Sequence, residues 1–61
     1  MAQLTRAQLD EISDYLAAGM SPDAIADLIG RIADLDYLDI ITIRSVAYDL
    51  SRGQTVHAKD E

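Results

Sequence analysis

Residues 18–23, Ala-Gly-Met-Ser-Pro-Asp, separate two amphipathic segments and decide the plan of the fold. Gly19 suits the left-handed position just past a helix end, so the first helix is predicted to end beside it. The next helix begins at once, because Ser21 is a favourable N-cap, Pro22 suits the first helical position and Asp23 complements the helix dipole. The stretch therefore predicts one helix ending and another starting within a few residues.

Upstream of this stretch, residues 5–18 are predicted to form the first helix. Thr5 and Gln8 have the spacing of a capping box, in which each side chain binds the backbone amide of the other residue. An apolar stripe follows at helical spacing and is predicted to face the core: Leu9, Ile12 and Leu16.

Downstream, a second helix is predicted over residues 21–30 and a third over residues 34–52. Gly30 is a plausible stop for the second helix, although the apolar pattern also allows it to continue to Ala33. Asp34 is the expected N-cap of the third helix, and Gly53 the residue that ends it. The buried face of the second helix is expected to contain Ala24, Ile25, Leu28 and Ile29.

The third helix is apolar on two sides. One side contains Ile40, Ile43, Ala47 and Leu50, and the other contains Tyr37, Ile41 and Tyr48. Such a helix is either central in the fold or covered by a second chain, so a homodimer through the third helix is one expectation. The run at residues 40–43 is rich in β-branched residues, as strands are, but about 17 residues without a breaker favour a helix. The domain is predicted to span residues 1–53, followed by a flexible polar tail at residues 54–61.

Composition restricts the classes of function. The chain has 61 residues, of which 11 are acidic and 5 basic, for a net charge of −6. This length allows one small domain. The absence of cysteine excludes disulfides and thiolate metal sites. No apolar run approaches the roughly 20 residues that span a bilayer, and we see no signal peptide. A cytoplasmic protein is therefore the expectation.

No pattern for catalysis is evident. The only histidine, His57, lies in the polar tail, and no glycine-rich phosphate loop is present. Carboxylates one helical turn apart, at residues 10 and 14 and at residues 23 and 27, lack the ligand spacing of an EF-hand. We therefore predict a protein that is not an enzyme, with no catalytic, cofactor-binding or metal-binding residues.

The acidic residues have two interpretations. In the first, they serve solubility alone, with Asp27 and Asp49 in ordinary helical ion pairs with Arg31 and Arg52. Alternatively, carboxylates at helical spacing imitate a row of phosphates and bind a groove lined by Lys and Arg. For that case Tyr37 is the best candidate for an exposed aromatic contact. The candidate partner-binding residues are Asp10, Glu11, Asp14, Asp23, Asp27, Asp34, Asp36, Tyr37 and Asp39.

Residues 15–30, Tyr-Leu-Ala-Ala-Gly-Met-Ser-Pro-Asp-Ala-Ile-Ala-Asp-Leu-Ile-Gly, resemble the first half of a bacterial helix-turn-helix. The resemblance implies a transcriptional regulator whose third helix enters the major groove. That helix, however, begins with Asp34, Asp36 and Asp39, and these carboxylates oppose the phosphate contacts on which DNA binding depends.

The small size, acidity, helical character and lack of cysteine resemble small phage-encoded inhibitors, particularly anti-CRISPR proteins and other nucleic-acid mimics. The resemblance implies a stoichiometric inhibitor of a basic nucleic-acid-binding protein, for example a CRISPR effector subunit, with no direct contact to nucleic acid or membrane. The alternatives are the divergent helix-turn-helix regulator and a homo-oligomeric helical module whose role is assembly.

Overall fold

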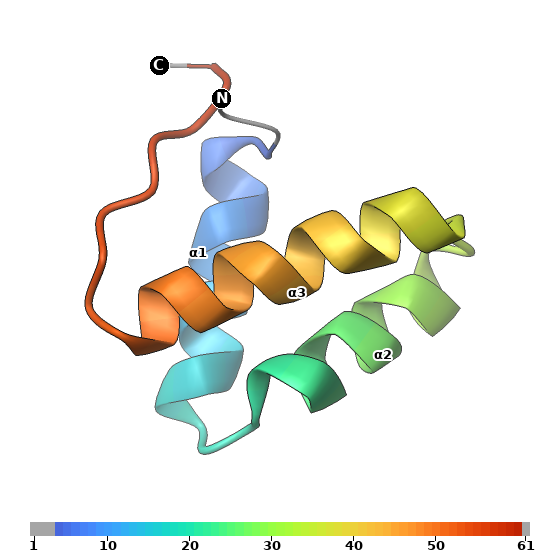
Figure 1. The fold of residues 1–61 in the computed structure, drawn as a ribbon, viewed down its shortest axis with the longest axis horizontal. Coiled ribbons are helices and arrows are strands. Elements are labelled where there is room, and N and C mark those ends of the chain that lie inside the picture. Colours follow the sequence, from blue (N-terminus) through green and yellow to red (C-terminus); the bar gives the residue numbers. More distant parts are fainter. Residues whose placement is uncertain (1–3, 61) are drawn as a thin grey trace.

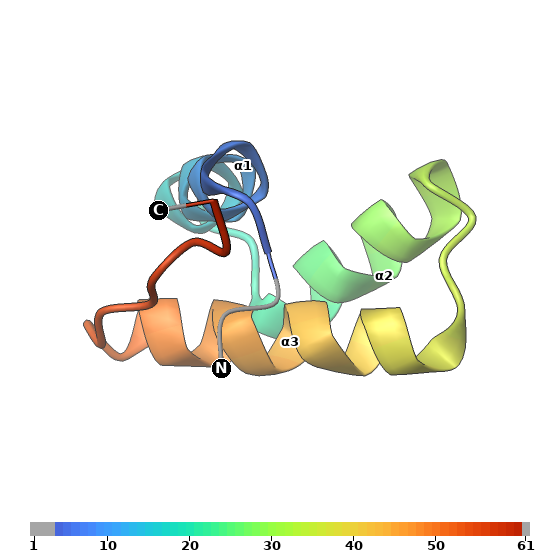
Figure 2. The same ribbon diagram turned by 90° about the horizontal axis from the view of Figure 1, so that it is seen from above.

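The computed structural model describes residues 4–60, and in this range it contains three helices and no strand (Figure 1). The helices are α1 (Arg6–Ala17), α2 (Pro22–Ile32) and α3 (Tyr37–Ser51). α2 and α3 run side by side in opposite directions, and α1 and α2 both lie on the same side of α3 (Figures 1 and 2). The predicted all-α three-helix domain is confirmed.

The first two helices start at the predicted caps. The Thr5 hydroxyl accepts a hydrogen bond from the Gln8 amide at 3.2 Å, and the Gln8 side-chain oxygen accepts one from the Thr5 amide at 2.9 Å. The Ser21 hydroxyl accepts a hydrogen bond from the Ala24 amide at 3.2 Å. These bonds satisfy amides that have no partner within the helix, which is why the helices begin where they do.

All three helices end in the same hydrogen-bonded motif. In each, one residue just past the helix has a positive φ: 97° for Gly19, 52° for Asp34 and 78° for Gly53. The next amide then donates to a carbonyl of the last helical turn, the arrangement known as a Schellman motif. The three bonds run from Met20 to Tyr15 at 3.1 Å, from Leu35 to Gly30 at 3.0 Å and from Gln54 to Asp49 at 3.0 Å.

Two predicted boundaries change around this second motif. α2 continues past Gly30 to Ile32, and α3 begins at Tyr37 instead of near Asp34. The N-cap of α3 is Asp36, whose carboxylate accepts a hydrogen bond from the Asp39 amide at 3.0 Å. Asp34 cannot cap α3, because its left-handed backbone closes α2.

Gly30 has a packing role instead of ending α2. It is buried within the helix, and a Cβ atom at this position would lie 2.8 Å from Cγ1 of Ile40. The missing side chain therefore lets α3 approach α2 closely.

The core lies where α1 and α2 meet α3. Its buried members within the described residues are Leu4, Leu9, Ile12, Ile25, Ala26, Ile43, Ala47 and Ala58. Of the two apolar sides of α3, the one with Ile43 and Ala47 faces the core, because these two residues are buried whereas Tyr37, Ile41 and Tyr48 are exposed. On α2 the prediction was partly wrong: Ala26 is buried and Ala24 exposed.

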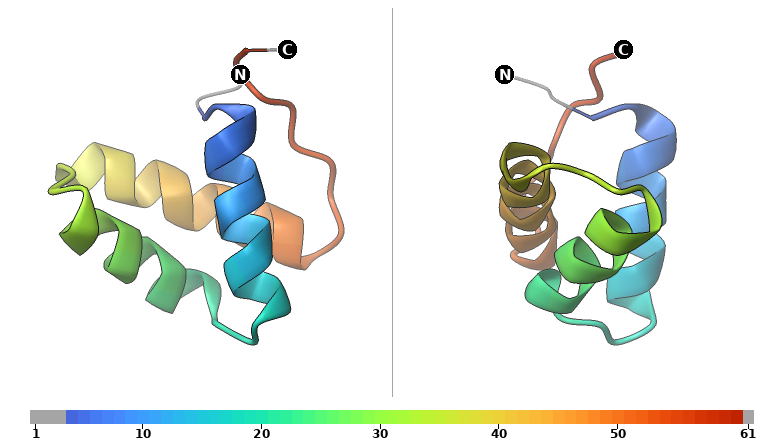
Figure 3. Two further views of the ribbon diagram at one scale, coloured as in Figure 1. Left: turned by 180° about the vertical axis from the view of Figure 1, so that it is seen from behind. Right: turned by 90° about the vertical axis from the view of Figure 1, so that its right-hand side faces the viewer.

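The segment at residues 54–60 packs back along α1 (Figure 3). Ala58 is buried, and the Lys59 amide donates a hydrogen bond to the Leu4 carbonyl at 2.8 Å. The flexibility predicted for this segment stays a prediction, and the structure adds the position in which it packs. Over residues 4–60, none of the helices has the length and apolar character needed to cross a membrane.

Candidate protein-binding surface

Arginine side chains neutralise some of the acidic residues and leave others unpaired. Four ion pairs join described residues: Asp10–Arg6 at 3.8 Å, Asp23–Arg44 at 3.6 Å, Asp27–Arg31 at 2.8 Å and Asp49–Arg52 at 2.5 Å. The two pairs predicted from helical spacing, at Asp27 and Asp49, are confirmed. These pairs are solvent-exposed, so each contributes at most about 1 kcal/mol. Three of them place a positive charge against a candidate contact residue, namely Asp10, Asp23 and Asp27.

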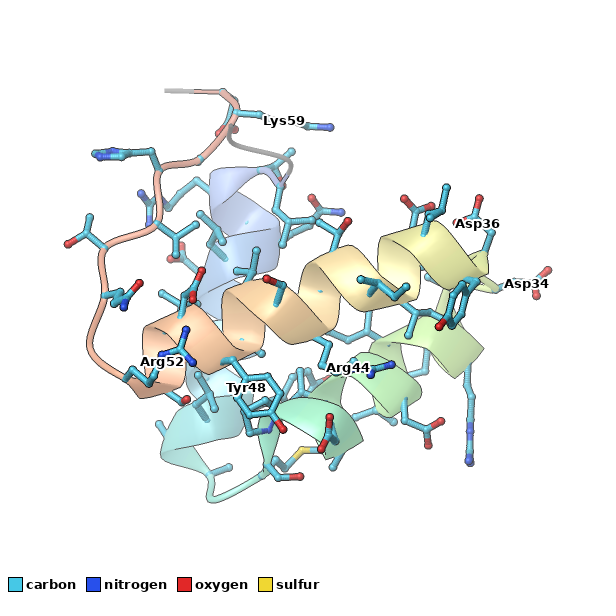
Figure 4. The ribbon with its side chains drawn as sticks, in the orientation of Figure 1. Asp34, Asp36, Arg44, Tyr48, Arg52 and Lys59 are labelled. Carbon is cyan, nitrogen blue, oxygen red and sulfur yellow. The ribbon has the colours of Figure 1, made fainter. Side chains whose placement is uncertain are left out.

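The α2–α3 turn carries the largest group of unpaired carboxylates. Asp34, Asp36 and Asp39, here called the turn cluster, are all exposed, and no cation of residues 4–60 lies within ion-pair distance of them. Figure 4 shows Asp34 and Asp36 projecting from the end of the α2–α3 pair. On α1, Glu11 and Asp14 are also without a cation in this range, and Glu11 accepts a hydrogen bond from the Tyr15 hydroxyl at 3.4 Å.

Asp34 occupies a backbone conformation that favours glycine. Its φ of 52° lies in the left-handed region, where the other two helix ends have Gly19 and Gly53. For L-residues this region costs about 1–2 kcal/mol, although Asp and Asn tolerate it better than most. The turn therefore holds a carboxylate at a position where glycine is the more stable residue.

Three large exposed apolar side chains lie close to the turn cluster in the sequence. Ile32, Tyr37 and Leu38 are 73%, 72% and 72% exposed. Adjacent exposed apolar groups, with tyrosine among them, are typical of protein–protein contact sites. We define the turn surface as these six residues: Ile32, Asp34, Asp36, Tyr37, Leu38 and Asp39.

Asp23, another predicted contact residue, has a structural role. Its carboxylate accepts a hydrogen bond from the Tyr48 hydroxyl at 3.0 Å and pairs with Arg44, so it joins α2 to α3 (Figure 4). The hydrogen bond to Asp23, followed by the negative charge of that residue, raises the pKa of Tyr48 above its usual value. Sequence reasoning missed this cluster because Tyr48 and Asp23 are 25 positions apart and no local pattern connects them.

A groove separates the first half of α1 from the turn. It consists of a pocket of about 200 Å³ and a neighbouring pocket of about 180 Å³, which share the lining residues Leu4, Gln8, Leu35 and Ile43. Glu11, Ile12, Ile29, Ile32 and Ala33 complete the first pocket; Asp39, Thr42 and Lys59 complete the second. The spread of α1 and α2 above α3 is visible in Figure 2. The groove thus adjoins the turn surface.

The predicted site residues consequently fall into three places. Asp10, Glu11 and Asp14 lie on α1, Asp23 and Asp27 lie on α2, and the turn surface contains the remainder. No group of three or more potential ligands among residues 4–60 is placed to hold a metal ion. Residues 15–30 span the end of α1, the connecting turn and most of α2. Comparison with models of protein families, with curated proteins and with solved structures finds no match to this chain.

Proposed function

We propose that this protein is a non-enzymatic inhibitor that binds a basic nucleic-acid-binding protein through the turn surface and keeps nucleic acid from that site. The observation that carries the proposal is the composition of this surface: three exposed carboxylates without a cation partner among the described residues, together with three exposed apolar side chains, Ile32, Tyr37 and Leu38. The mode of action is that of anti-CRISPR proteins and other nucleic-acid mimics, and a CRISPR effector subunit is one partner of the required kind.

Electrostatics supports a basic partner over DNA. A Lys- and Arg-lined site that normally binds phosphates is complementary to the turn cluster, and opposite charges accelerate the encounter. The apolar side chains of Ile32, Tyr37 and Leu38 supply the area that stable interfaces bury at their centre. DNA offers phosphates instead, which the same carboxylates repel.

The first test removes the charge of the turn cluster without changing its shape. In the variant Asp34→Asn/Asp36→Asn/Asp39→Asn, asparagine retains both the N-cap at position 36 and the tolerance of positive φ at position 34. The matched control, Asp10→Asn/Asp14→Asn/Asp49→Asn, changes the net charge equally but on α1 and at the far end of α3. Circular dichroism establishes that both variants keep their helices.

Wild type and both variants are then immobilised and exposed to bacterial lysate, with washes of rising salt and with competing duplex DNA. We expect wild type and control to retain a basic nucleic-acid-binding protein that DNA displaces, as identified by mass spectrometry. With the purified partner, we expect the turn-cluster variant to bind at least about tenfold more weakly, a loss of about 1.4 kcal/mol. Equal binding by all three proteins would contradict the proposal.

A gel-shift experiment at low salt separates the proposal from its alternatives. The chain alone should leave DNA unshifted, and it should release DNA from the purified partner near a one-to-one ratio. A shift of DNA by the chain alone would favour the helix-turn-helix regulator. Recovery of only the bait, together with a dimer in light scattering, would favour the assembly module.

A further inference from the structure

We propose that the groove between α1 and the turn receives one apolar side chain of the partner, carried on an amphipathic segment whose neighbouring residues are Lys or Arg. This inference rests on the proposed function and adds the chemistry of the segment that is recognised. It predicts that the interface has an apolar anchor beside the electrostatic contact of the turn cluster.

The lining of the groove favours an apolar side chain over a polar small molecule. The lining of the first pocket is largely aliphatic and includes Ile12 of α1, Ile29 of α2 and Ile43 of α3. Every buried side-chain polar atom of the described residues has a hydrogen-bond partner, so no buried polar group is available to orient a polar ligand.

A carboxylate lines each of the two pockets of the groove. Glu11 lines the first pocket and Asp39 the second, where Lys59 is the one basic lining residue. Leu35, which both pockets share, lies between Asp34 and Asp36 in the sequence. An apolar side chain inserted here thus brings its neighbours on the partner against negative charge, and Lys or Arg is complementary at those positions.

A second copy of this chain is a poor occupant. Its large exposed apolar side chains include Tyr37 and Leu38, which lie directly between Asp36 and Asp39 in the sequence. Insertion of either side chain would bring carboxylates of one copy against those of the other, which is repulsive. A basic amphipathic helix has the opposite charge and presents its apolar residues in the way that helix-in-groove recognition requires.

The probes that test this inference are two fluorescein-labelled amphipathic helical peptides. One is composed of Lys and Leu, and in the other every Leu is replaced by Ala, so the two carry the same charge. Binding to the full chain is followed by fluorescence anisotropy at physiological salt. Because burying a Leu side chain removes more apolar surface from water than burying an Ala side chain, we expect the Leu peptide to bind at least about tenfold more tightly than the Ala peptide.

Two pairs of variants locate the binding. Ala33→Leu places a larger side chain in the groove and should reduce the preference for the Leu peptide to less than about twofold. Ala24→Leu, an equal change at an exposed position outside the groove, should preserve it. Glu11→Lys should weaken binding of the Leu peptide more than Asp14→Lys does. Asp14 lies on the same helix as Glu11 but lines neither pocket. Methyl resonances of Ile12, Ile29 and Leu35 should shift on addition of the Leu peptide.

Failure of this inference is distinguishable from failure of the proposed function. Equal affinity for the two peptides, or a preference for the Leu peptide that persists in Ala33→Leu, would refute the inference that the groove receives an apolar side chain. The turn cluster would then remain as the proposed electrostatic contact. The inference would also be refuted if neither peptide bound. The lysate experiment judges the proposed function independently, because it depends on the turn-cluster variant and uses neither peptide.

Discussion

At the scale of single residues, Asp34 is a position at which two requirements favour different side chains. The positive φ favours glycine, whereas the negative charge of the surface requires aspartate. Its backbone has the positive φ at which α1 and α3 end in glycine, yet its carboxylate is exposed and unpaired within the described residues. An unfavourable conformation that the surrounding structure maintains is an indication of function. Under the proposed function, the negative charge of the turn surface explains why aspartate occupies this position.

Replacement of this residue should separate the two effects. We expect Asp34→Gly to raise the free energy of unfolding by about 0.5–1 kcal/mol, because glycine adopts positive φ without steric cost but loses more entropy on folding. The same variant should weaken capture of the basic partner. Asp34→Asn should weaken capture similarly while changing stability little. Thermal unfolding with a binding assay measures both, and a glycine variant less stable than wild type would refute the explanation.

The same residue marks where sequence reasoning succeeded and where it failed. Gly19 and Gly53 were correctly predicted to lie just past their helices, because few residues other than glycine suit that conformation. Asp34 was predicted to cap α3 and instead closes α2. Aspartate is favourable at N-caps and also tolerated at positive φ, so residue type alone does not distinguish the two positions.

At the scale of helices, the sequence was sufficient for the number and order of elements but not for their contacts. Caps and apolar periodicity are local signals, which is why all three helices were found. The choice among acidic clusters depended on tertiary pairing: Arg44 on α3 neutralises Asp23 on α2, whereas no cation of residues 4–60 reaches the turn cluster. That distinction follows from the packing of α2 on α3, which local patterns do not specify.

The α2–α3 contact predicts a pH dependence of stability. The raised pKa of Tyr48 means that folding favours the protonated phenol, chiefly through its hydrogen bond to Asp23. Its contribution is therefore complete below the unfolded pKa of about 10 and is lost as the pH rises through the raised folded pKa. Tyr48→Phe should lower the melting temperature at pH 7 and 9, and its difference from wild type should shrink by pH 11.

Tyr37→Phe is the matched control for this prediction, because Tyr37 is exposed and makes no hydrogen bond to Asp23. Its melting temperature should follow that of wild type across the same pH range, as measured by circular dichroism. A difference between wild type and Tyr48→Phe that stays constant from pH 7 to 11 would show that the hydrogen bond to Asp23 does not stabilise the fold.

At the scale of the whole molecule, the acidic charge is unevenly distributed. The chain carries a net charge of −6 within extents of 26 × 24 × 16 Å. Its acidic groups lie within a few Debye lengths of one another, since that length is about 8 Å at physiological ionic strength. Ion pairs reduce the field beside Asp10, Asp23, Asp27 and Asp49. Under the proposed function, we therefore expect the turn cluster to contribute most to steering toward a basic partner.

Salt should therefore act in opposite directions on folding and on binding. Raising NaCl from about 0.02 to 0.5 M should raise the melting temperature modestly, because it screens repulsion among the excess carboxylates. The same change should slow association with the Lys–Leu peptide at least about tenfold, because it also screens steering.

The turn-cluster variant and its matched control have the same net charge, so their melting temperatures should show similar salt dependence. Only the turn-cluster variant should lose the salt dependence of the association rate in stopped-flow measurements. An equal loss in both variants would mean that net charge, and not the placement of charge at the α2–α3 turn, governs encounter with the partner.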